Sequence, residues 1–499
     1  MISRREWTWV GAAGAAIVVI ANLPYLAAYA APSGQVFGGI LFAFQDGFSY
    51  LAKMRQGWRG EWLFTLPYTA EPGAGVFLYT YYLFLGHLAR WTGLSLEAVY
   101  HGARLAGGGL MLGAAYRLIA RFVDTVNGRW RAWLLFSLGS GLGWLAAPWL
   151  PLPPDWWITE ALPFLSLISN AHFPLAWALL LFLLEVTLPG VAEMPLGRRL
   201  AWAAAVTLML SQVQLLALIP AGVVLGGATV WRAARRRVWR WADWLPALVV
   251  AAVTAPWALQ AVWLTQTHPA LRAWNAQNLT PSPAPLEALV WGGLPLLLAL
   301  RGGWLAARRR WPPADLLLLW LGLGVALIYA PVALQRRLSM GVWLPICLLA
   351  EVGIAAGWPR WAKALGGVAA TLSSLLVWAA LWSAALTRRP EVYLTLAEAD
   401  AIARLPAGAL VLAAPETGTL IPARSDARVL YGHQFETADA ARQRQAVEDF
   451  FAGRAPQLPD TAAVDVVFYG PREAALGPAP QLPGWRILWQ AGAVRVYGR

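Results

Sequence analysis

The chain has 499 residues, of which 59% are hydrophobic and only 13% are charged, and it carries a formal net charge of +13. Because a soluble protein of this size has roughly 25% charged residues, the composition excludes an ordinary soluble enzyme. The apolar residues form repeated runs of about 20, the length that crosses the hydrocarbon core of a bilayer. The basic residues lie in short clusters between these runs, which excludes a nucleic-acid-binding face as the reason for the positive charge. We therefore expect a multi-pass membrane protein.

The first apolar run, residues 7–31, follows Arg4 and Arg5. With the small-residue stretch Ala28–Ala30 near its end it is typical of a signal peptide, but it is also long enough to span a membrane. We interpret it as an uncleaved signal anchor. Both interpretations place the N-terminus in the cytoplasm.

The apolar runs predict about eleven membrane spans, and the basic clusters between them follow the positive-inside rule. The spans are expected near residues 8–30, 97–120, 131–150, 172–188, 200–216, 217–231, 243–264, 285–300, 314–334, 340–357 and 362–386. The clusters expected on the cytoplasmic side are Arg117 to Arg131, Arg198 with Arg199, Arg232 to Arg240, Arg308 to Arg310, and Arg360 with Lys363.

A further apolar stretch, Gly75–Leu88, is expected to lie in the outer membrane interface rather than to span the bilayer. Counting it as a span would move the basic clusters 117–131 and 232–240 to the outer side, against the positive-inside rule. Its aromatic residues suit the depth of an interfacial helix. The first outer loop, residues 31–96, is therefore much longer than an ordinary connection.

The odd number of spans places the C-terminal tail outside the cytoplasm. Charges return after Thr387, and short strand signals alternate with amphipathic helices. Strands are expected at 409–414, 428–431 and 464–469, helices at 398–405 and 437–452, and a hairpin at 485–497. The predicted fold class is an all-α polytopic membrane domain, residues 1–386, followed by a small soluble α/β domain, residues 387–499.

Asp46 is the candidate catalytic residue of the first outer loop. It lies in the aromatic and apolar stretch Phe44–Lys53. An acid at the membrane surface costs desolvation energy, and desolvation raises the pKa of a carboxylate toward that of a general base. The alternative is a structural role, because Asp is preferred as the N-cap of a helix and an amphipathic segment follows it.

Arg336 and Arg337 are the candidate phosphate-binding residues. They lie at the outer end of the predicted span 314–334, where the positive-inside rule predicts few cations. Two guanidiniums at this depth suit a phosphate or diphosphate, because each planar fork can bond two phosphate oxygens. The alternative is that they only reach toward lipid headgroups. Arg104, at the outer start of the predicted span 97–120, is a further candidate.

Other polar residues on the predicted outer side are possible substrate contacts: Lys53, Glu160, His172 and His433. A lone histidine is more often a hydrogen-bonded structural residue, and His433 is equally well explained as a buried histidine of a turn. The five histidines form no metal-binding pair, and the single Cys347 excludes an intrachain disulfide and a cysteine-based zinc site. We expect no metal and no other cofactor, although the sequence leaves a divalent ion open.

The layout resembles the GT-C glycosyltransferases, polytopic enzymes that take sugars from polyprenyl-phosphate carriers. The resemblance rests on Asp46 as the acid of a long first outer loop, on the helix 50–57 after it, and on residues 100–104 at the start of the next span. A closer resemblance, to an uncharacterised bacterial branch of this superfamily, rests on short motifs. They are Ser169–Phe173, Gln335–Leu338 with Gly341 and Pro345, Ala414–Gly418, and Tyr431–Thr437.

This resemblance implies a transferase that moves a hexose or pentose from a polyprenyl-phosphate donor to a lipid, glycan or protein acceptor. The implied place is the outer face of the bacterial cytoplasmic membrane, with Asp46 as general base and with Arg336, Arg337 and Arg104 at the lipid phosphate. Many members have two adjacent acids in the first loop, whereas here Gln45 precedes Asp46. This departure favours a metal-independent, inverting displacement. The tail is expected to cover the site or to bind the acceptor.

Two other functions remain open. A transporter or lipid flippase would use charged residues within the spans, but the sequence shows no inverted repeat, and its intramembrane acids are few: Glu185, Glu287 and Glu351. A non-enzymatic assembly factor would use the tail to bind envelope components. The long, acid-bearing outer loop favours the transferase.

Overall fold

The structure, a computed structural model, describes residues 2–30, 34–355, 357–455 and 463–499. The chain divides into two compact units. The helical unit comprises residues 1–23, 101–259 and 280–381, and the mixed unit comprises residues 24–100, 260–279 and 382–499. The tail, expected as a domain of its own from residue 387, therefore shares one unit with the first outer loop.

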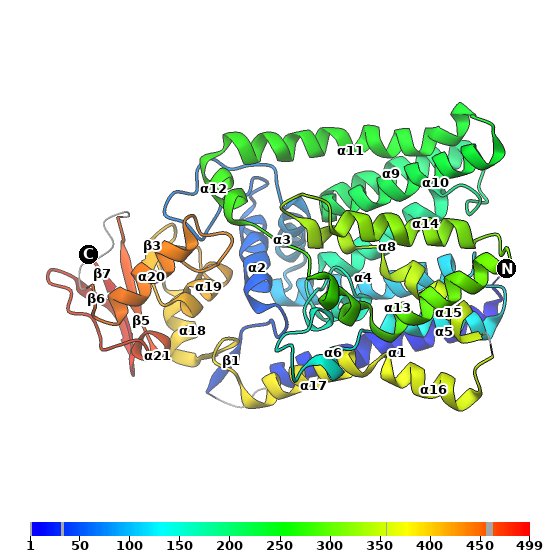
Figure 1. The fold of residues 1–499 in the computed structure, drawn as a ribbon. Coiled ribbons are helices and arrows are strands. Elements are labelled where there is room, and N and C mark those ends of the chain that lie inside the picture. Colours follow the sequence, from blue (N-terminus) through cyan, green and yellow to red (C-terminus); the bar gives the residue numbers. More distant parts are fainter. Residues whose placement is uncertain (1, 31–33, 356, 456–462) are drawn as a thin grey trace. The chain divides into compact units, whose positions relative to one another are not determined.

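The helical unit is built from apolar helices (Figure 1). Its α-helices are α1 (Arg4–Tyr29), α4 (Leu96–Ile119), α5 (Val126–Leu138), α6 (Gly143–Ala146), α7 (Pro163–Ile168), α8 (His172–Thr187), α9 (Leu196–Gln214), α10 (Leu218–Arg236), α11 (Trp241–Thr267), α13 (Pro285–Arg308), α14 (Ala314–Ile328), α15 (Trp343–Ala355), α16 (Arg360–Ala369) and α17 (Leu372–Thr387). Its 3-10 helices are η1 (Pro154–Trp156), η2 (Leu215–Ala217) and η3 (Gln335–Ser339). The chain passes from one unit to the other within α1, α11 and α17, at the first turns of α4, and between residues 279 and 280.

Long apolar helices make the chain a multi-pass membrane protein. Among the described residues, four helical stretches are long and apolar enough to cross a bilayer, and the bent pair α16 and α17 adds a fifth if it counts as one span. Shorter apolar helices are α8, α14 and α15. The total of eleven spans stays a prediction.

Two predicted spans have a different form in the structure. The span expected at 131–150 is interrupted, because α5 ends at Leu138 and only the short α6 follows. At Gly141 a Cβ atom would lie 2.1 Å from the Val290 carbonyl oxygen, so the chain passes close to another backbone here. The span expected at 362–386 is bent by 43° between α16 and α17. Apolar content predicted the positions of these runs but not their breaks.

Small residues allow close packing of helices in this unit. A Cβ atom at Gly302 of α13 would lie 1.8 Å from the Leu349 carbonyl oxygen of α15, and one at Gly353 would lie 2.3 Å from the Leu298 carbonyl oxygen. Only glycine permits this approach of two helix backbones, as is common within membranes. Glycines at the contact therefore fix how α13 and α15 pack.

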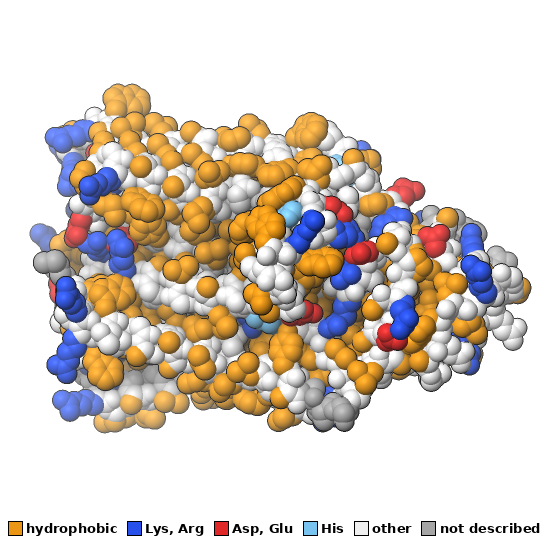
Figure 2. All heavy atoms as spheres, turned by 180° about the vertical axis from the view of Figure 1, so that it is seen from behind, with side chains coloured by type: hydrophobic (Ala, Val, Ile, Leu, Met, Phe, Trp, Pro, Cys, Tyr) orange, Lys and Arg blue, Asp and Glu red, His pale blue; other side chains and the backbone are white. Residues whose placement is uncertain are grey.

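The surface of the helical unit is apolar over a wide area, and Figure 2 shows Lys and Arg side chains gathered at one end of it. Exposed arginines occupy the connection from α10 to α11 and the connection from α13 to α14. Figure 1 shows both connections and the N-terminus at the same end of the unit. Two of the basic connections therefore share one end of the unit, and the side of the membrane on which they lie stays a prediction.

The mixed unit contains a five-stranded sheet in the order β4-β3-β5-β7-β6. Its strands are β3 (Leu410–Leu412), β4 (Arg428–Val429), β5 (Val466–Tyr469), β6 (Arg486–Ala491) and β7 (Val494–Gly498). Strand β3 pairs in parallel with β4 and β5, whereas β7 pairs antiparallel with β5 and β6. Every residue of β3 and β5 is buried, as the continuous apolar runs predicted. The strands and the closing hairpin lie within or close to the expected ranges.

Helices and a second small sheet complete this unit. Strands β1 (Gln35–Phe37) and β2 (Tyr393–Thr395) pair antiparallel, which joins the first outer loop to the tail. The helices are α2 (Phe44–Arg59), α3 (Thr80–Thr92), α12 (Pro269–Gln277), α18 (Leu396–Ala403), α19 (Pro415–Arg424), α20 (Ala440–Phe451) and α21 (Pro471–Ala474). Helix α3, which covers most of the predicted interfacial stretch, is not among the candidate spans found in the described residues.

Candidate active site

Helix α2 carries Asp46 and is held against α3 by two glycines. A Cβ atom at Gly57 would lie 2.0 Å from the Leu83 carbonyl oxygen, and one at Gly86 would lie 1.9 Å from the Met54 carbonyl oxygen. The two helix backbones therefore lie so close together that only glycine fits at these two positions. This contact fixes the position of α2 within the mixed unit.

Asp46 lies in the first turn of α2, so the N-cap alternative is wrong. The N-cap residue is Ala43, whose φ of 49° places it in the left-handed region and whose side chain makes no capping bond. The Asp46 side chain is 53% exposed. From the sequence, burial was expected to desolvate this carboxylate. The carboxylate is instead open to solvent or substrate.

His433 of the tail lies beside Asp46. Its Nε2 atom is 3.3 Å from Asp46 Oδ1, and the histidine side chain is only 2% exposed. On the other side of the ring, Nδ1 accepts hydrogen bonds from the backbone N–H groups of Phe435 at 3.2 Å and Glu436 at 3.3 Å. Because Nδ1 accepts, the neutral tautomer of the ring carries its proton on Nε2. The ring therefore presents Nε2 to Asp46, but at 3.3 Å the two atoms are not aligned for a hydrogen bond, and Nε2 has no hydrogen-bond partner among the described residues.

The turn that carries His433 is fixed by its own residues and by α12. The Thr437 hydroxyl accepts hydrogen bonds from the backbone N–H groups of Gly432 and His433, both at 3.3 Å. From α12, the Gln277 amide donates to the Phe435 carbonyl oxygen at 2.8 Å and also to that of Thr437. Backbone and side-chain bonds therefore set the direction of the imidazole.

A close backbone contact brings the two tail motifs together. A Cβ atom at Gly418 would lie 2.1 Å from the Tyr431 carbonyl oxygen, and one at Gly432 would lie 2.5 Å from the Gly418 carbonyl oxygen and 2.6 Å from the Tyr68 ring. The motifs Ala414–Gly418 and Tyr431–Thr437 thus meet at α19. Their glycines are explained by this contact, which places His433.

A buried ion pair lies on the same turn and helix. Lys53 Nζ is 2.7 Å from Glu436 Oε1, and the two side chains are 0% and 10% exposed. The Ser49 hydroxyl also bonds Glu436 Oε1, and Ser49 and Lys53 are one helical turn apart on α2. The pair therefore ties α2 to the turn that carries His433.

Aromatic rings enclose the Lys53 ammonium. It lies 4.3 Å from the ring centre of Tyr79, 5.1 Å from that of Tyr50 and 5.3 Å from that of Phe64. Such contacts favour a cation, most strongly where water is excluded. Lys53 was expected as a possible substrate contact, and in the structure its side chain is 0% exposed and its ammonium is paired with Glu436.

Burial and charge shift the pKa values around this pair. Burial lowers the pKa of Lys53 below its ordinary value, against the opposing charge of Glu436. Burial acts to raise the pKa of Glu436, but the charge and the hydrogen bond of Lys53 outweigh it, so that this pKa lies below its ordinary value. Burial also raises the pKa of the Tyr68 phenol well above its ordinary value. Tyr68 donates to the Thr419 carbonyl oxygen at 3.1 Å and stays protonated.

The remaining predicted residues belong to the helical unit. Arg336 lies in η3, where its Nε is 3.1 Å from Glu160 Oε1 and its guanidinium is 4.6 Å from the Trp157 ring centre. Glu160, expected as a substrate contact, is 5% exposed and serves as the partner of Arg336. Arg337 follows in the same 3-10 helix and is half-buried. The structure therefore pairs two residues that the sequence analysis treated separately.

Arg104 and His172 are enclosed in the helical unit. Arg104 is 1% exposed, and its guanidinium donates to the carbonyl oxygens of Ile168 and Ser169 and to Asn22 Oδ1. His172 is 4% exposed and its ring centre lies 4.0 Å from that of Phe173. A phosphate at Arg104 would have to replace these bonds to Ile168, Ser169 and Asn22. We therefore do not propose Arg104 as a ligand of the phosphate.

Sequence reasoning missed Glu436, Ser49 and Gln277. Glu436 lies inside the motif Tyr431–Thr437, and the spacing of Ser49 and Lys53 on a helix was visible, but their partner is 387 residues away from Ser49. The side chains of His, Cys, Asp and Glu in the described ranges form no group of three that could hold a metal ion.

Comparison with known proteins identifies the fold. No protein-family model and no curated protein matches the chain. Solved structures do match, including ArnT from Cupriavidus metallidurans in its apo state, with a TM-score of 0.55 and 15% identity over 98% of this chain and 97% of that one. The same protein bound to undecaprenyl phosphate matches with a TM-score of 0.55 and 13% identity over 99% and 98%.

The oligosaccharyltransferase AglB from Archaeoglobus fulgidus, in complex with an inhibitory peptide and a dolichol-phosphate, matches with a TM-score of 0.53 and 13% identity over 93% of this chain and 70% of that one. These proteins belong to the GT-C superfamily of glycosyltransferases. The chain has the GT-C fold. The resemblance inferred from the sequence is confirmed at the level of the fold, and in this GT-C fold the mixed unit holds both Asp46 and His433.

Proposed function

We propose that this protein is a membrane glycosyltransferase that moves a sugar from a polyprenyl-phosphate carrier to an acceptor hydroxyl. The observation that supports this most directly is the approach of Asp46, half exposed, to the buried and oriented His433 at 3.3 Å. Solved structures of the same fold contain undecaprenyl phosphate or dolichol-phosphate. Transfer takes place at the extracytoplasmic face of the bacterial cytoplasmic membrane in this proposal.

Asp46 is the general base of the proposed reaction. The acceptor hydroxyl attacks the anomeric carbon of the sugar and gives its proton to the Asp46 carboxylate. The bond from that carbon to the phosphate oxygen breaks, and the phosphate leaves with the electron pair. A single displacement inverts the anomeric configuration. The donor is a hexose or pentose, and no step passes through a metal ion.

His433 positions the base. Its Nε2 atom lies 3.3 Å from one oxygen of the Asp46 carboxylate, which is 53% exposed, so that a small movement would let the imidazole orient the base. Lys53 and Glu436 hold the turn that carries the imidazole, and they do not contact substrate in this mechanism. The tail thereby supplies part of the site rather than only covering it.

Arg336 and Arg337 are proposed to bind the phosphate of the donor. Arg336 uses its Nε for Glu160 in the structure, and its guanidinium has further N–H groups with which to bond phosphate oxygens. The positive charge of these arginines beside the leaving phosphate favours cleavage of the bond between the sugar and the phosphate.

The test measures the transfer of label from polyprenyl-phosphate hexoses and pentoses to acceptor in membranes that contain wild-type protein or a variant. For Asp46→Asn we expect a loss of about 100-fold or more, the contribution of a general base. The matched control is Glu416→Gln, because Glu416 is also an exposed acid in the first turn of a helix of the mixed unit. Undiminished transfer by Asp46→Asn would reject the assignment of the base.

Two variants of His433 distinguish a positioning role of this residue from a structural one. His433→Gln keeps a donor near the position of Nε2 and should retain more activity than His433→Ala, while both variants fold.

A chelator should leave wild-type transfer unchanged. If wild-type protein moves no sugar from any donor but carries labelled lipid across the membrane of proteoliposomes, the protein is a flippase, the alternative that its few intramembrane charges disfavour.

A further inference from the structure

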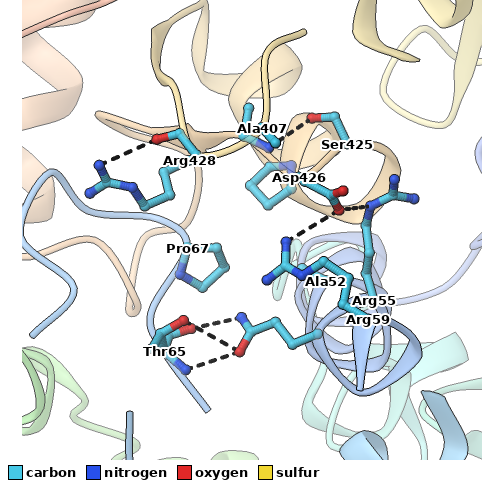
Figure 3. A pocket seen from close by; sticks show the side chains of 13 residues that line it. Ala52, Arg55, Arg59, Thr65, Pro67, Ala407, Ser425, Asp426 and Arg428 are labelled. Atoms are coloured by element: carbon cyan, nitrogen blue, oxygen red, sulfur yellow. Dashed lines mark hydrogen bonds and ion pairs between the residues drawn. The ribbon is translucent and has the colours of Figure 1, made fainter. Parts of the chain in front are cut away.

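A pocket of about 440 Å³ opens on the mixed unit beside α2 (Figure 3). Its walls come from α2, from the segment after α2 and from two stretches of the tail, residues 407–408 before β3 and residues 422–428 from the end of α19 to the start of β4. Among its lining residues are Arg55, Gln56, Arg59, Thr65, Asp426 and Arg428. Arg55 follows Asp46 by nine residues, or about two and a half helical turns, which places the two on opposite sides of α2.

Positive charge predominates in this pocket. Arg55, Arg59 and Arg428 line it together with a single acid, Asp426. Asp426 Oδ1 lies 2.7 Å from Arg55 Nε and 3.2 Å from Arg59 Nη1, so that one oxygen bonds two guanidiniums. Glu61 compensates part of the charge of Arg59 at 2.9 Å. Three arginines against these two acids leave a net charge of +1, and Arg428 makes no ion pair among the described residues, so that its charge is available to an anionic ligand.

The arginines are held in place without using all their donors. Arg428 donates to the Ala70 carbonyl oxygen at 2.6 Å and to that of Gly408 at 3.4 Å, and Arg55 uses its Nε for Asp426. Each guanidinium has five N–H donors, so both keep donors beyond these bonds. A rigid frame of several guanidiniums suits a group with several acceptor oxygens.

Neutral side chains keep the frame in shape. The Gln56 amide donates to the Thr65 carbonyl oxygen at 2.8 Å and accepts from the Thr65 N–H at 3.0 Å. This reciprocal pair ties α2 to the wall that contains Thr65, as Figure 3 shows. A ligand would therefore meet a wall that is already ordered and would lose little free energy in ordering it.

We propose that this pocket is a second binding site, which takes a phosphoryl group and is separate from the site at Asp46. In the free protein the Asp426 carboxylate occupies the place among the guanidiniums that a phosphoryl oxygen takes in the complex. Asp426 thus competes with the ligand and sets its affinity. The phosphoryl group is carried by an acceptor or by the headgroup of a phospholipid. This binding does not depend on the transferase activity.

The probe is inorganic pyrophosphate, titrated into full-length protein in nanodiscs of zwitterionic lipid and followed by calorimetry. We expect saturable binding that weakens as salt rises. Arg55→Gln should weaken it about tenfold, since one charge-assisted hydrogen bond contributes about this factor. Arg404→Gln is the matched control, because Arg404 is an exposed arginine of the mixed unit that pairs only with Asp400 through its Nε at 3.1 Å among the contacts of the described residues, outside the pocket.

Asp426→Asn distinguishes ligand binding from a structural role. Loss of a competing carboxylate should tighten pyrophosphate binding several-fold, although the same change removes ion pairs and lowers thermal stability. Absence of saturable binding, or an unchanged affinity in both Arg55→Gln and Asp426→Asn, would overturn the proposal. Displacement of pyrophosphate by polyprenyl phosphate would also overturn it, because the pocket would then belong to the donor site.

Nanodiscs with anionic phospholipid identify the source of the phosphoryl group. If they weaken pyrophosphate binding in the wild type but not in Arg55→Gln, the pocket binds a headgroup. If they leave it unchanged, the ligand is the phosphate of an acceptor. Either result supports the site, and failure of sugar transfer in the experiment above would leave it untouched.

Discussion

A buried lysine and glutamate, Lys53 and Glu436, hold the candidate active site at the scale of single residues. Removing two charges from water is costly, and their attraction offsets this only when geometry and hydrogen bonds are good. Here the distance is 2.7 Å, and Ser49 and a set of aromatic rings complete the surroundings. The main role of the pair is therefore to specify how α2 and the turn that carries His433 meet. Its net contribution to stability is small.

Breaking this pair on one side should destabilise the protein strongly. Lys53→Met leaves Glu436 buried without its partner, and we expect a loss of about 3–5 kcal/mol in the free energy of unfolding. The double variant Lys53→Met with Glu436→Gln should recover much of it, because no uncompensated charge remains. Denaturant titration of the solubilised protein measures both.

The control for this prediction is the half-exposed pair of Arg59 and Glu61, with side chains 31% and 40% exposed. Glu61→Gln should cost at most about 1 kcal/mol, as for exposed ion pairs in general. A double variant as unstable as Lys53→Met alone would show that packing, and not charge, is the main effect.

The same pair predicts a loss of stability in acid. The pKa of Glu436 lies below its ordinary value, so the folded state binds its proton less readily than the unfolded state does. Its contribution is complete above the ordinary pKa of about 4.3 and is lost as the pH falls through the lower folded value. Below about pH 4 the melting temperature of the wild type should therefore fall more steeply than that of Glu436→Gln. Parallel curves for the two proteins would contradict this.

Between elements, backbone contacts at glycine decide the geometry. Helices α2 and α3 meet at Gly57 and Gly86, and α19 meets the turn after β4 at Gly418 and Gly432. At each position a methyl group would overlap a carbonyl oxygen, so the contact exists only because the side chain is absent. Turn and helix then place His433 within reach of α2.

Gly432→Ala should disturb the candidate site through this contact. The new Cβ atom would lie 2.5 Å from the Gly418 carbonyl oxygen, so the turn must move and carry His433 with it. We expect a cost of about 1–3 kcal/mol in stability and a larger loss in transfer than that of the control. Gly102→Ala is the control, because nothing lies within 4 Å of its Cβ position. Equal activity of the two variants would contradict the role of the turn.

At the scale of the whole molecule, basic connections gather at one end of the helical unit (Figure 2). With a cytoplasmic N-terminus and an odd number of spans, as expected from the sequence, the tail and its His433 lie outside the cell, where polyprenyl-phosphate donors for such transfer are used in our proposal. Because several helices are short or bent, the side of the membrane on which the tail lies needs a direct experiment.

Labelling of single cysteines tests this orientation. Cys347 is buried and can be replaced by Ser. In that background, a cysteine in place of the exposed Arg442 of α20 should react with a membrane-impermeant maleimide in intact spheroplasts. A cysteine in place of the exposed Arg309 should react only after permeabilisation. The reverse pattern would show that the tail is cytoplasmic.

The sequence by itself determined the membrane character, the basic clusters and most strands of the tail. These features depend on local properties: the length of an apolar run against the thickness of a bilayer, and the continuous apolar content of buried strands. It also singled out Asp46 and the motif that contains His433. It could not assign Lys53, which was expected at the substrate and is instead enclosed.

Only the tertiary structure decided which of these residues meet. Ser49 and Glu436 are separated by 387 residues, and no local pattern specifies such a contact, because burial is a property of the packed unit and not of a segment. The same holds for Arg104, Glu160 and the bends in the predicted spans. Local hydrophobicity predicted which segments are apolar enough to lie in a membrane. Packing around glycines and one buried ion pair decided which residues of the candidate site lie together.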